Sequence, residues 1–268
     1  MTTFLCFRLH GPLASWGDVA VGERRPTSPH LSRSAVLGLV AGAIGIRRDD
    51  QTSWAELERA FGFASRTDAP GELLLDFHTA QGPDEKLLRA EAGAAKRAKV
   101  PWHRPATRRV ELGFRRQELS TLLSMRQYRV DAAWTAALWL RPEVQAPPWS
   151  MSQLQEALRR PCFVPYLGRK SCTLDLPMEP QLVDAADPIA AMGAAAFRTD
   201  DLLEPVLGRG VGMGTVQWEG TWPGLAPAQT VRRRDRVSSR ARWQFAEREE
   251  HQARWTPPEG GIHVPQQS

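Results

Sequence analysis

The stretch TFLCFRLHGPLASWG at residues 3–17, followed by RRPTSPHLSRSAVLGLVAGAIGIRRD at residues 24–49, decides the fold class. The first eight residues predict a strand with Leu5, Phe7 and Leu9 on one face. Gly and Pro end that strand, and two further prolines exclude a helix from the loop that follows. The beginning of the chain is therefore an apolar strand that leads into an arginine-rich loop.

A helix is expected directly after this loop. Ser32 or Ser34 can cap it, and Gly45 is suited to end it. The apolar positions between them recur at helical spacing and predict one buried face. A strand followed by a helix is therefore the opening unit of the fold.

The rest of the chain predicts a helix and two strands, then a long insertion, then a strand, a helix and a further extended segment. In order, we expect a helix opened by a capping box at Ser53–Glu56, a hairpin of residues 63–66 and 72–79, a strand at 131–140, and a helix capped at Ser152 and ended by Pro161. This order predicts an α+β fold, a ferredoxin-like sheet of the modified RRM type with helices on one face. The domains expected are a core of 1–79 and 126–200, an inserted basic segment at 80–125, a C-terminal region at 201–256 and a disordered tail at 257–268.

Basic residues are concentrated in the insertion. The chain has 35 Lys and Arg against 30 Asp and Glu, a net charge of +5. Residues 96–116 contain eight basic residues and one acid, 8 − 1 = +7, so the remainder sums to −2. Arginine outnumbers lysine 31 to 4, which suits phosphate binding and equally fits a GC-rich genome. A long, basic insertion of this kind indicates an anionic partner, with a solvated loop as the alternative.

Several function classes are disfavoured by the sequence. The cysteines Cys6, Cys162 and Cys172 form no C-x-x-C pair and are expected to be buried thiols in a reducing cytosol. The six histidines show no metal-ligand spacing, so neither a metal site nor a cofactor is expected. No signal peptide or membrane span is recognisable, so we expect a cytoplasmic protein that does not contact a membrane.

The C-terminal part gives weaker signals. GRGVGMG at residues 208–214 is more typical of a flexible turn than of a phosphate loop, and TVQWE at 215–219 predicts a strand. Residues 231–254 contain eight arginines against four acids, interleaved with Trp243 and Phe245. This pattern suits RNA stacking or a charged helix, and both alternatives stay open.

Three further blocks complete the pattern: GELLLDFHTA at 71–80, RQYRVDAAWTAALWL at 126–140 and FVPYLGRKSC at 163–172. Their order and spacing resemble the Cas-five family of the RAMP superfamily, in particular the CasD-type subunits of type I-E CRISPR Cascade complexes. The resemblance covers most of residues 1–180. It implies a modified RRM core, a thumb at the insertion that bends RNA, and a non-catalytic role in which the subunit holds the 5′ handle of the CRISPR RNA. It also implies a backbone subunit of the Cas-seven family and the large subunit CasA as partners, with target DNA contacted indirectly.

The resemblance and the basic turns together nominate an RNA-binding set. A helix start with free N–H groups can bind phosphate, a tight basic turn allows close backbone contact, and a tyrosine can stack on a base or lie in the core. Leu31 replaces the usual proline of the family loop, and Asp49 can pin the arginines before it. The nominated residues are Arg25, Thr27, Arg33, Ser34, Arg47, Arg48, Arg108, Arg109, Arg126, Tyr128, Gly168, Arg169, Lys170 and Ser171.

Two other functions compete with this interpretation. A metal-independent endoribonuclease that processes precursor CRISPR RNA needs a general base near a 2′-hydroxyl, with Tyr128, Tyr166, Lys170, His30 and His78 as candidates. Type I-C relatives cut RNA with residues of that kind, whereas the blocks DFHTA and PYLGRKS favour the non-catalytic role with no catalytic residue. The third possibility is a general RRM-type RNA binder that works alone.

Overall fold

The computed structural model describes residues 1–17, 20, 22–111, 113–114, 116–207, 214–239, 242 and 244–255. The chain divides into two compact units. Unit 1 contains Met1–Asp18, Pro26–Leu74 and Tyr128–Ser268, and unit 2 contains Val19–Arg25 and Leu75–Gln127. The glycine-rich residues 208–213, Trp243 and the predicted disordered tail lie outside the described residues.

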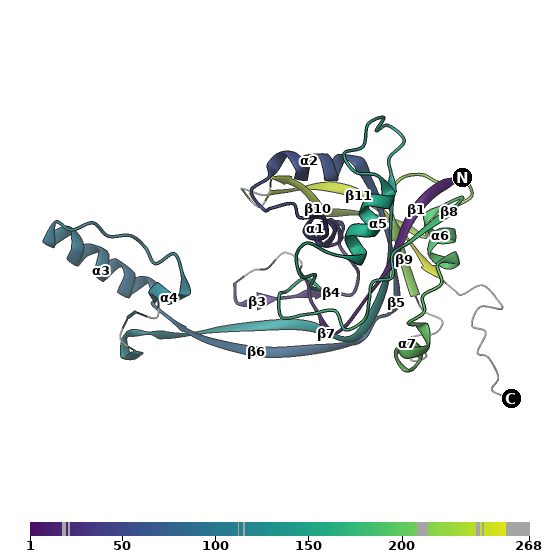
Figure 1. Cartoon of the computed structure of the whole chain (residues 1–268). Coiled ribbons are helices and arrows are strands. Elements are labelled where there is room, and N and C mark those ends of the chain that lie inside the picture. Colours follow the sequence, from purple (N-terminus) through teal and green to yellow (C-terminus); the bar gives the residue numbers. More distant parts are fainter. Residues whose placement is uncertain are drawn as a thin grey trace. The chain divides into compact units, whose positions relative to one another are not determined.

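A twisted sheet forms the centre of unit 1 (Figure 1). Its strands follow the order β10-β11-β9-β5-β7-β1-β8. The bounds are β1 (Thr2–Ala14), β5 (Phe61–Ala69), β7 (Ser120–Leu140), β8 (Gln181–Ala185), β9 (Gly214–Trp218), β10 (Gln229–Ser239) and β11 (Gln244–Trp255). Every pair along this path is antiparallel. The predicted strand at 215–219 is confirmed as β9, and the C-terminal segment extends the same sheet.

The two faces of β1 belong to two different cores. Leu5, Phe7 and Leu9 point into one core, as the alternation predicts. This core also contains side chains of α1 (Arg33–Ile44), α2 (Gln51–Ala60) and α5 (Met151–Arg159). Phe4 and Cys6 point into the second core, which is covered by α6 (Pro188–Ala194). The expectation of helices on one face alone is therefore wrong, because the second face of β1 is also apolar and needs a cover.

The remaining elements of unit 1 are short. Helix α7 (Asp200–Leu207) contacts β5. Strands β2 (Trp16–Gly17) and β4 (Thr27–Ser28) form a separate antiparallel pair in the arginine-rich loop. Thr27, which the sequence nominated for RNA binding, lies in β4 and pairs with Gly17 of β2.

The helix caps follow the predicted chemistry at partly different residues. Ser32 caps α1 by accepting from the Ala35 N–H, and Gly45 ends the helix at φ 92°, as predicted. Asp50 caps α2 instead of Ser53, which donates its own N–H to the Asp50 carboxylate. The capping box of α5 is Ser150–Gln153, two residues earlier than expected.

Two strand assignments differ from the sequence prediction. Strands β5 and β6 (Glu72–Gly82) do not form a hairpin with each other, because both pair with the 21-residue strand β7. Residues 229–239 and 244–255 form the antiparallel β10–β11 pair, so the helical alternative for 231–254 is wrong. Apolar alternation shows that a segment is a strand, and it does not show which strand is its neighbour.

Unit 2 contains the basic insertion. It includes β3 (Arg24–Arg25), α3 (Glu85–Ala98), α4 (Arg108–Glu111), η1 (Arg116–Glu118) and the portions of β6 and β7 within its range (Figure 1). Strand β3 pairs with β7 at Met125 and Arg126. Asp84 caps α3 by accepting from the Leu87 N–H at 2.7 Å and also accepts from the Ser120 hydroxyl at 3.1 Å, which ties the helix to the start of β7.

Candidate nucleic-acid interface

The turn Gly168–Ser171 has a backbone that only glycine can begin. Gly168 adopts φ 84°, and a Cβ atom there would lie 1.9 Å from the carbonyl oxygen of Ser15. The Leu167 N–H donates to Cys172 O at 2.7 Å, and the Ser15 N–H donates to Leu167 O at 3.0 Å. These bonds fix the turn against the chain that leaves β1.

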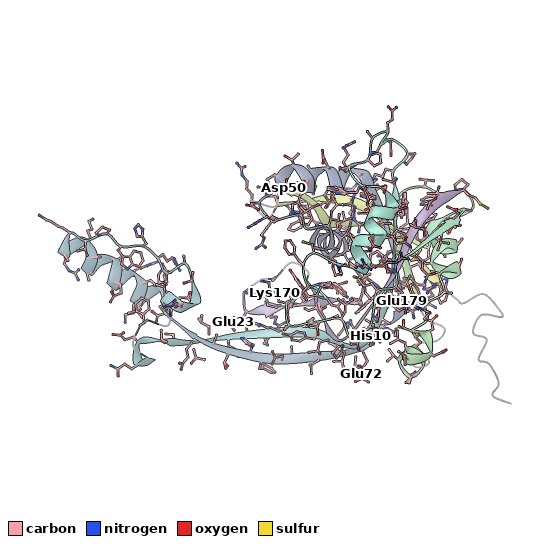
Figure 2. All side chains as sticks on the ribbon, in the orientation of Figure 1. His10, Glu23, Asp50, Glu72, Lys170 and Glu179 are labelled. Atoms are coloured by element: carbon pink, nitrogen blue, oxygen red, sulfur yellow. The ribbon has the colours of Figure 1, made fainter. Side chains whose placement is uncertain are left out.

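The side chains of this turn lie at the surface. Lys170 and Ser171 are exposed, and Figure 2 labels Lys170. Arg169 is half-buried, and its guanidinium carbon lies 4.6 Å from the centroid of the Tyr128 ring. Stacking of this kind fixes the direction of a guanidinium without neutralising its charge. The turn therefore presents an oriented arginine beside an exposed lysine.

Tyr128 lies in the core. It is only 8% exposed, and its ring carries Arg169 on one face. Of the two interpretations that the sequence left open, the core tyrosine is confirmed. In this structure the ring does not offer a free face for a base.

Thr27 forms a buried hydrogen bond to the chain that follows β1. Its hydroxyl accepts the Trp16 N–H at 2.9 Å, and its side chain is buried. Because Trp16 directly follows Ser15, Thr27 helps to hold the segment against which the Gly168 turn packs. Its contribution is therefore to position that segment and not to touch a ligand.

Arg33 is an interior ion-pair residue. Only 1% of it is exposed, its Nη1 contacts the Glu58 carboxylate, and its Nε lies 2.8 Å from Glu219 Oε1. Nη2 donates to the carbonyl oxygens of Glu58 and Phe61, each at 2.8 Å. Burial lowers the pKa of Arg33 to about 10, because the charged form loses water, while Glu219 opposes this shift. The interpretation of Arg33 as a phosphate ligand is corrected, since its guanidinium is enclosed by protein.

The start of α1 already binds an anion. The backbone N–H of Arg33 donates to Asp235 Oδ2 at 2.8 Å. The half-buried Ser34 hydroxyl lies 3.3 Å from that of Ser32. Asp235 thus occupies the position that the sequence assigned to a phosphate, and it satisfies the same helix dipole.

The basic pair after α1 remains accessible. The Arg47 side chain is 82% exposed, and its Nε lies 3.9 Å from Asp49 Oδ1. Arg48 is also exposed. The separation from Asp49 is long for an exposed pair, so this carboxylate pins Arg47 only weakly.

The remaining nominated residues belong to unit 2. Arg25 is exposed and donates to the carbonyl oxygen of Arg24 at 3.0 Å. Arg126 is half-buried beside Ser124, and Arg109 is exposed. The Arg108 side chain lies outside the described part of the structure. Unit 2 therefore presents exposed basic side chains of its own.

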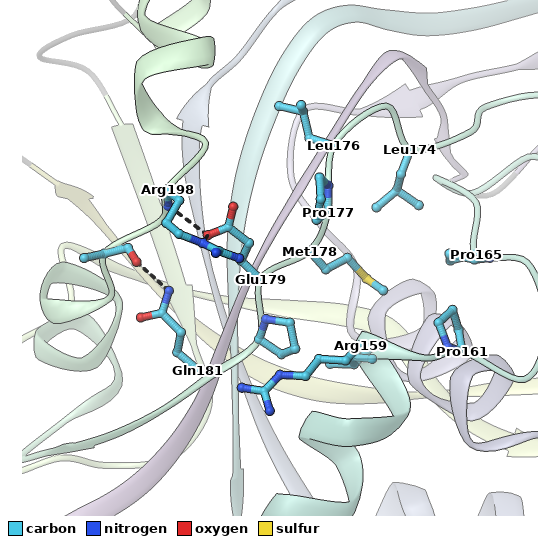
Figure 3. Close-up of a pocket in the computed structure, with 13 residues that line it drawn as sticks. Arg159, Pro161, Pro165, Leu174, Leu176, Pro177, Met178, Glu179, Gln181 and Arg198 are labelled. Carbon is cyan, nitrogen blue, oxygen red and sulfur yellow. Dashed lines mark hydrogen bonds and ion pairs between the residues drawn. The ribbon is translucent and has the colours of Figure 1, made fainter.

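A groove of unit 1 is lined mainly by apolar side chains, with Arg159 and Arg198 also among its lining residues (Figure 3). It has a volume of about 600 Å³, and prolines and aliphatic side chains such as Leu174, Leu176 and Met178 dominate its lining. At its edge Glu179, with φ 45°, accepts the Arg198 N–H at 2.8 Å. A carboxylate paired in this way beside apolar side chains offers neither an acid–base pair nor a phosphate cradle.

The nuclease candidates belong to both units. The Nδ1 of His30 lies 3.0 Å from Gln217 Nε2 inside unit 1, whereas His78 is exposed on β6. Sequence analysis missed His10, whose Nδ1 lies 2.8 Å from Asp175 Oδ1. The two residues are 165 positions apart, so no local motif could reveal this pair. Among the described residues no three His, Cys, Asp or Glu side chains are grouped as a metal site needs. No described helix is long and apolar enough to cross a membrane.

Comparison with known proteins identifies the family. Residues 4–250 match the model of the CRISPR-associated Cas5 proteins. The chain belongs to this family. It is 33% identical to the CRISPR system Cascade subunit CasD of Escherichia coli (strain K12) over 192 residues, which is 72% of this chain and 76% of that protein.

Solved structures share the fold of this family member. One chain of a CRISPR RNA-guided surveillance complex aligns with TM-score 0.57 and 24% identity, over 94% of this chain and 89% of that one. A Cas protein of known crystal structure aligns with TM-score 0.53 and 22% identity, over 95% of each chain. At these identities the likeness concerns the fold alone.

Proposed function

We propose that this chain is a non-catalytic subunit of a type I-E Cascade complex that holds the 5′ handle of the CRISPR RNA and caps the backbone filament in antiviral defence. Its partners are the Cas-seven-family backbone subunit and the large subunit CasA, with target DNA contacted through the assembly. The observation that carries the RNA-binding role is the Gly168–Ser171 turn, where Arg169 is held over Tyr128 beside the exposed Lys170. The identity to a Cascade CasD subunit supports the assignment to that complex.

The proposed fold supports the same role. Strands β5, β7, β1 and β8 lie side by side in that order, and helices follow β1 and β7 along the chain. This order is compatible with a ferredoxin-like sheet of the RRM type, the fold that we propose for the core. We propose further that unit 2, with its +7 segment, is the thumb that contacts the RNA.

Binding of a handle RNA tests the role of the turn. In purified complex, Arg169→Ala or Lys170→Ala should each weaken binding roughly tenfold to a hundredfold, because a charged hydrogen bond is worth about 1.5–3 kcal/mol. Arg160→Ala is the matched control, since Arg160 is 86% exposed at the end of α5. If both turn variants retain RNA as well as the control does, the turn is a solvated loop and the proposal fails.

Incubation with repeat RNA in EDTA tests the nuclease alternative. We expect intact RNA, because the buried Tyr128 and the internal His30 do not present a general base to a 2′-hydroxyl. Metal-free cleavage that Lys170→Ala abolishes would transfer the assignment to an endoribonuclease. Purification of the chain alone with RNA, without Cascade subunits, would favour a general RNA binder instead.

A further inference from the structure

The β10–β11 pair has two faces with different charge chemistry. Along β10 the side chains alternate, so Arg232, Arg234 and Arg236 are exposed while Arg233 and Asp235 face inward and are half-buried. β10 is the last strand of the sheet order, with β11 as its strand neighbour. The exposed arginines therefore follow one another at every second residue along the end strand of the sheet.

The inward arginines are paired with carboxylates. Arg233 Nε lies 3.2 Å from Glu250 Oε1. Arg248, which is opposite Arg233 in the ladder, lies 2.6 Å from both Asp235 and Glu250. On this face the protein supplies its own counter-ions.

The exposed arginines have no such neutralisation. Within the described residues, Arg232 and Arg236 form no ion pair, and Arg234 donates its Nε to the carbonyl oxygen of Phe245 at 3.1 Å. Glu249 is opposite Arg232 in the ladder and Glu247 is exposed on β11, yet neither comes within ion-pair distance of these arginines. Three positive charges thus stand on the strand without a fixed counter-ion in the part of the chain that the structure describes.

We propose that Arg232, Arg234 and Arg236 form a second nucleic-acid contact, which binds the phosphate backbone of a strand independently of its sequence. Alternate residues of a regular strand are about 6.4–6.8 Å apart, a spacing comparable to that of neighbouring phosphates in an extended single strand. The ladder register shifts between Arg233 and Arg236, so β10 departs from regular pairing there, while the alternation of exposed residues continues. Each guanidinium offers a fork that matches a phosphate. Contacts to the backbone alone confer affinity without sequence specificity.

The composition of this face argues against a protein partner. The exposed positions of β10 are Gln229, Thr230, Arg232, Arg234, Arg236 and Ser238, and none is apolar or aromatic. A stable protein interface has a desolvated apolar or aromatic centre. A charged strand without such a centre suits a polyanion.

Salt-dependent binding by the full chain tests this contact. The triple variant Arg232→Ala/Arg234→Ala/Arg236→Ala is compared with Arg159→Ala/Arg160→Ala/Arg198→Ala, which removes the same charge from exposed positions elsewhere. The probes are a single-stranded RNA of arbitrary sequence and a DNA duplex. For the single strand, the log–log salt slope should become shallower by about 2 in the strand variant, because each lost phosphate contact contributes about 0.7. The control variant should keep the wild-type slope.

The outcomes are separable. The double variant Arg232→Ala/Arg236→Ala keeps the Arg234 bond to Phe245 and guards against misfolding, and it should lose about 1.4 in slope. An effect confined to the duplex identifies DNA as the source of the phosphates and still supports the contact. Equal slopes in the strand and control variants, for both probes, would overturn the proposal. Because the probe lacks a handle sequence, failure here leaves the role of Arg169 and Lys170 untouched.

Discussion

The Ser32–Ser34 segment and the Gly168–Ser171 turn look equivalent in the sequence, since each sets an arginine among small hydroxyl or glycine residues. In the structure they differ in what surrounds the arginine. Arg33 is enclosed by Glu58 and Glu219, whereas Arg169 lies on an aromatic ring beside an exposed lysine. Whether such an arginine forms buried ion pairs or stays at the surface therefore depends on whether carboxylates from distant parts of the sequence contact it.

The largest expected effect tests the interior half of this comparison. Arg33→Ala should lower the free energy of unfolding by about 3–5 kcal/mol, because it leaves the buried Glu58 carboxylate without its counter-ion, whereas Glu219 keeps Arg141 at 2.6 Å. Chemical denaturation measures this difference. Arg47→Ala is the matched control and should cost less than about 0.5 kcal/mol, since that side chain is 82% exposed. Equal denaturation midpoints for the two variants would contradict the assignment of Arg33 to the interior and of Arg47 to the surface.

The next effect tests the turn. Gly168→Ala should destabilise the protein by at least about 1–3 kcal/mol, because φ 84° is strained for alanine and its Cβ would overlap Ser15 O. Thermal unfolding measures the change. Gly193→Ala, in α6 with open space around it, should be neutral or slightly stabilising. If the two variants unfold at the same temperature, position 168 accepts a Cβ atom and the turn does not require glycine.

The pH dependence of stability tests the loop before α1. Burial lowers the pKa of His30 below its ordinary 6.5, and the neighbouring Arg233 lowers it further. Below pH 6.5 the unfolded chain binds a proton that the folded chain does not, so stability falls as the pH falls. The fall can reach about 1.4 kcal/mol per pH unit for this group.

Comparison with His30→Gln isolates this titration from the carboxylates. The wild type should lose stability relative to the variant between pH 6.5 and 5, as followed by denaturant midpoints in a pH series. Parallel profiles would mean that His30 is solvated in the folded protein, and that the loop does not belong to the interior.

The smallest effect distinguishes the three thiols without altering stability. Cys162 is exposed beside the end of α1, whereas Cys6 and Cys172 are buried. Burial raises the pKa of Cys6 to about 12 and also raises that of Cys172, so neither forms a reactive thiolate at pH 8. An alkylating reagent should label one cysteine rapidly in the native protein, and Cys162→Ser should abolish that label. Rapid labelling of a second thiol would contradict the burial of the other two.

Local patterns predicted the elements well because their causes are local. The alternation of Leu5, Phe7 and Leu9 and the caps Ser32 and Gly45 depend on neighbours within a few residues. The expectation that all three cysteines are buried was wrong for Cys162, which stands on a loop just past the helix-ending Pro161. A loop residue has no periodicity from which its burial could be inferred.

The candidate site was harder to predict because its decisive contacts are not local. The residues next to Arg33 in the sequence do not predict its contacts with Glu219 and Asp235. The residues next to Arg169 likewise do not predict its contact with Tyr128. The pairing of β6 with β7 was missed for the same reason. The basic turn at Gly168–Ser171 was found, since a glycine followed by Arg-Lys-Ser carries its chemistry in adjacent residues.

The bond between Arg33 and Asp235 spans 202 positions, which has a consequence for synthesis on the ribosome. At about 5–20 residues per second, Asp235 is translated roughly 10–40 s after Arg33. During that interval the Arg33 N–H at the start of α1 lacks its Asp235 acceptor. The Arg33 guanidinium likewise lacks Glu219 until that residue is translated. The C-terminal strands therefore supply the last contact that stabilises the first turn of α1. A chain truncated before these strands would lack the hydrogen bond from the Arg33 N–H to Asp235.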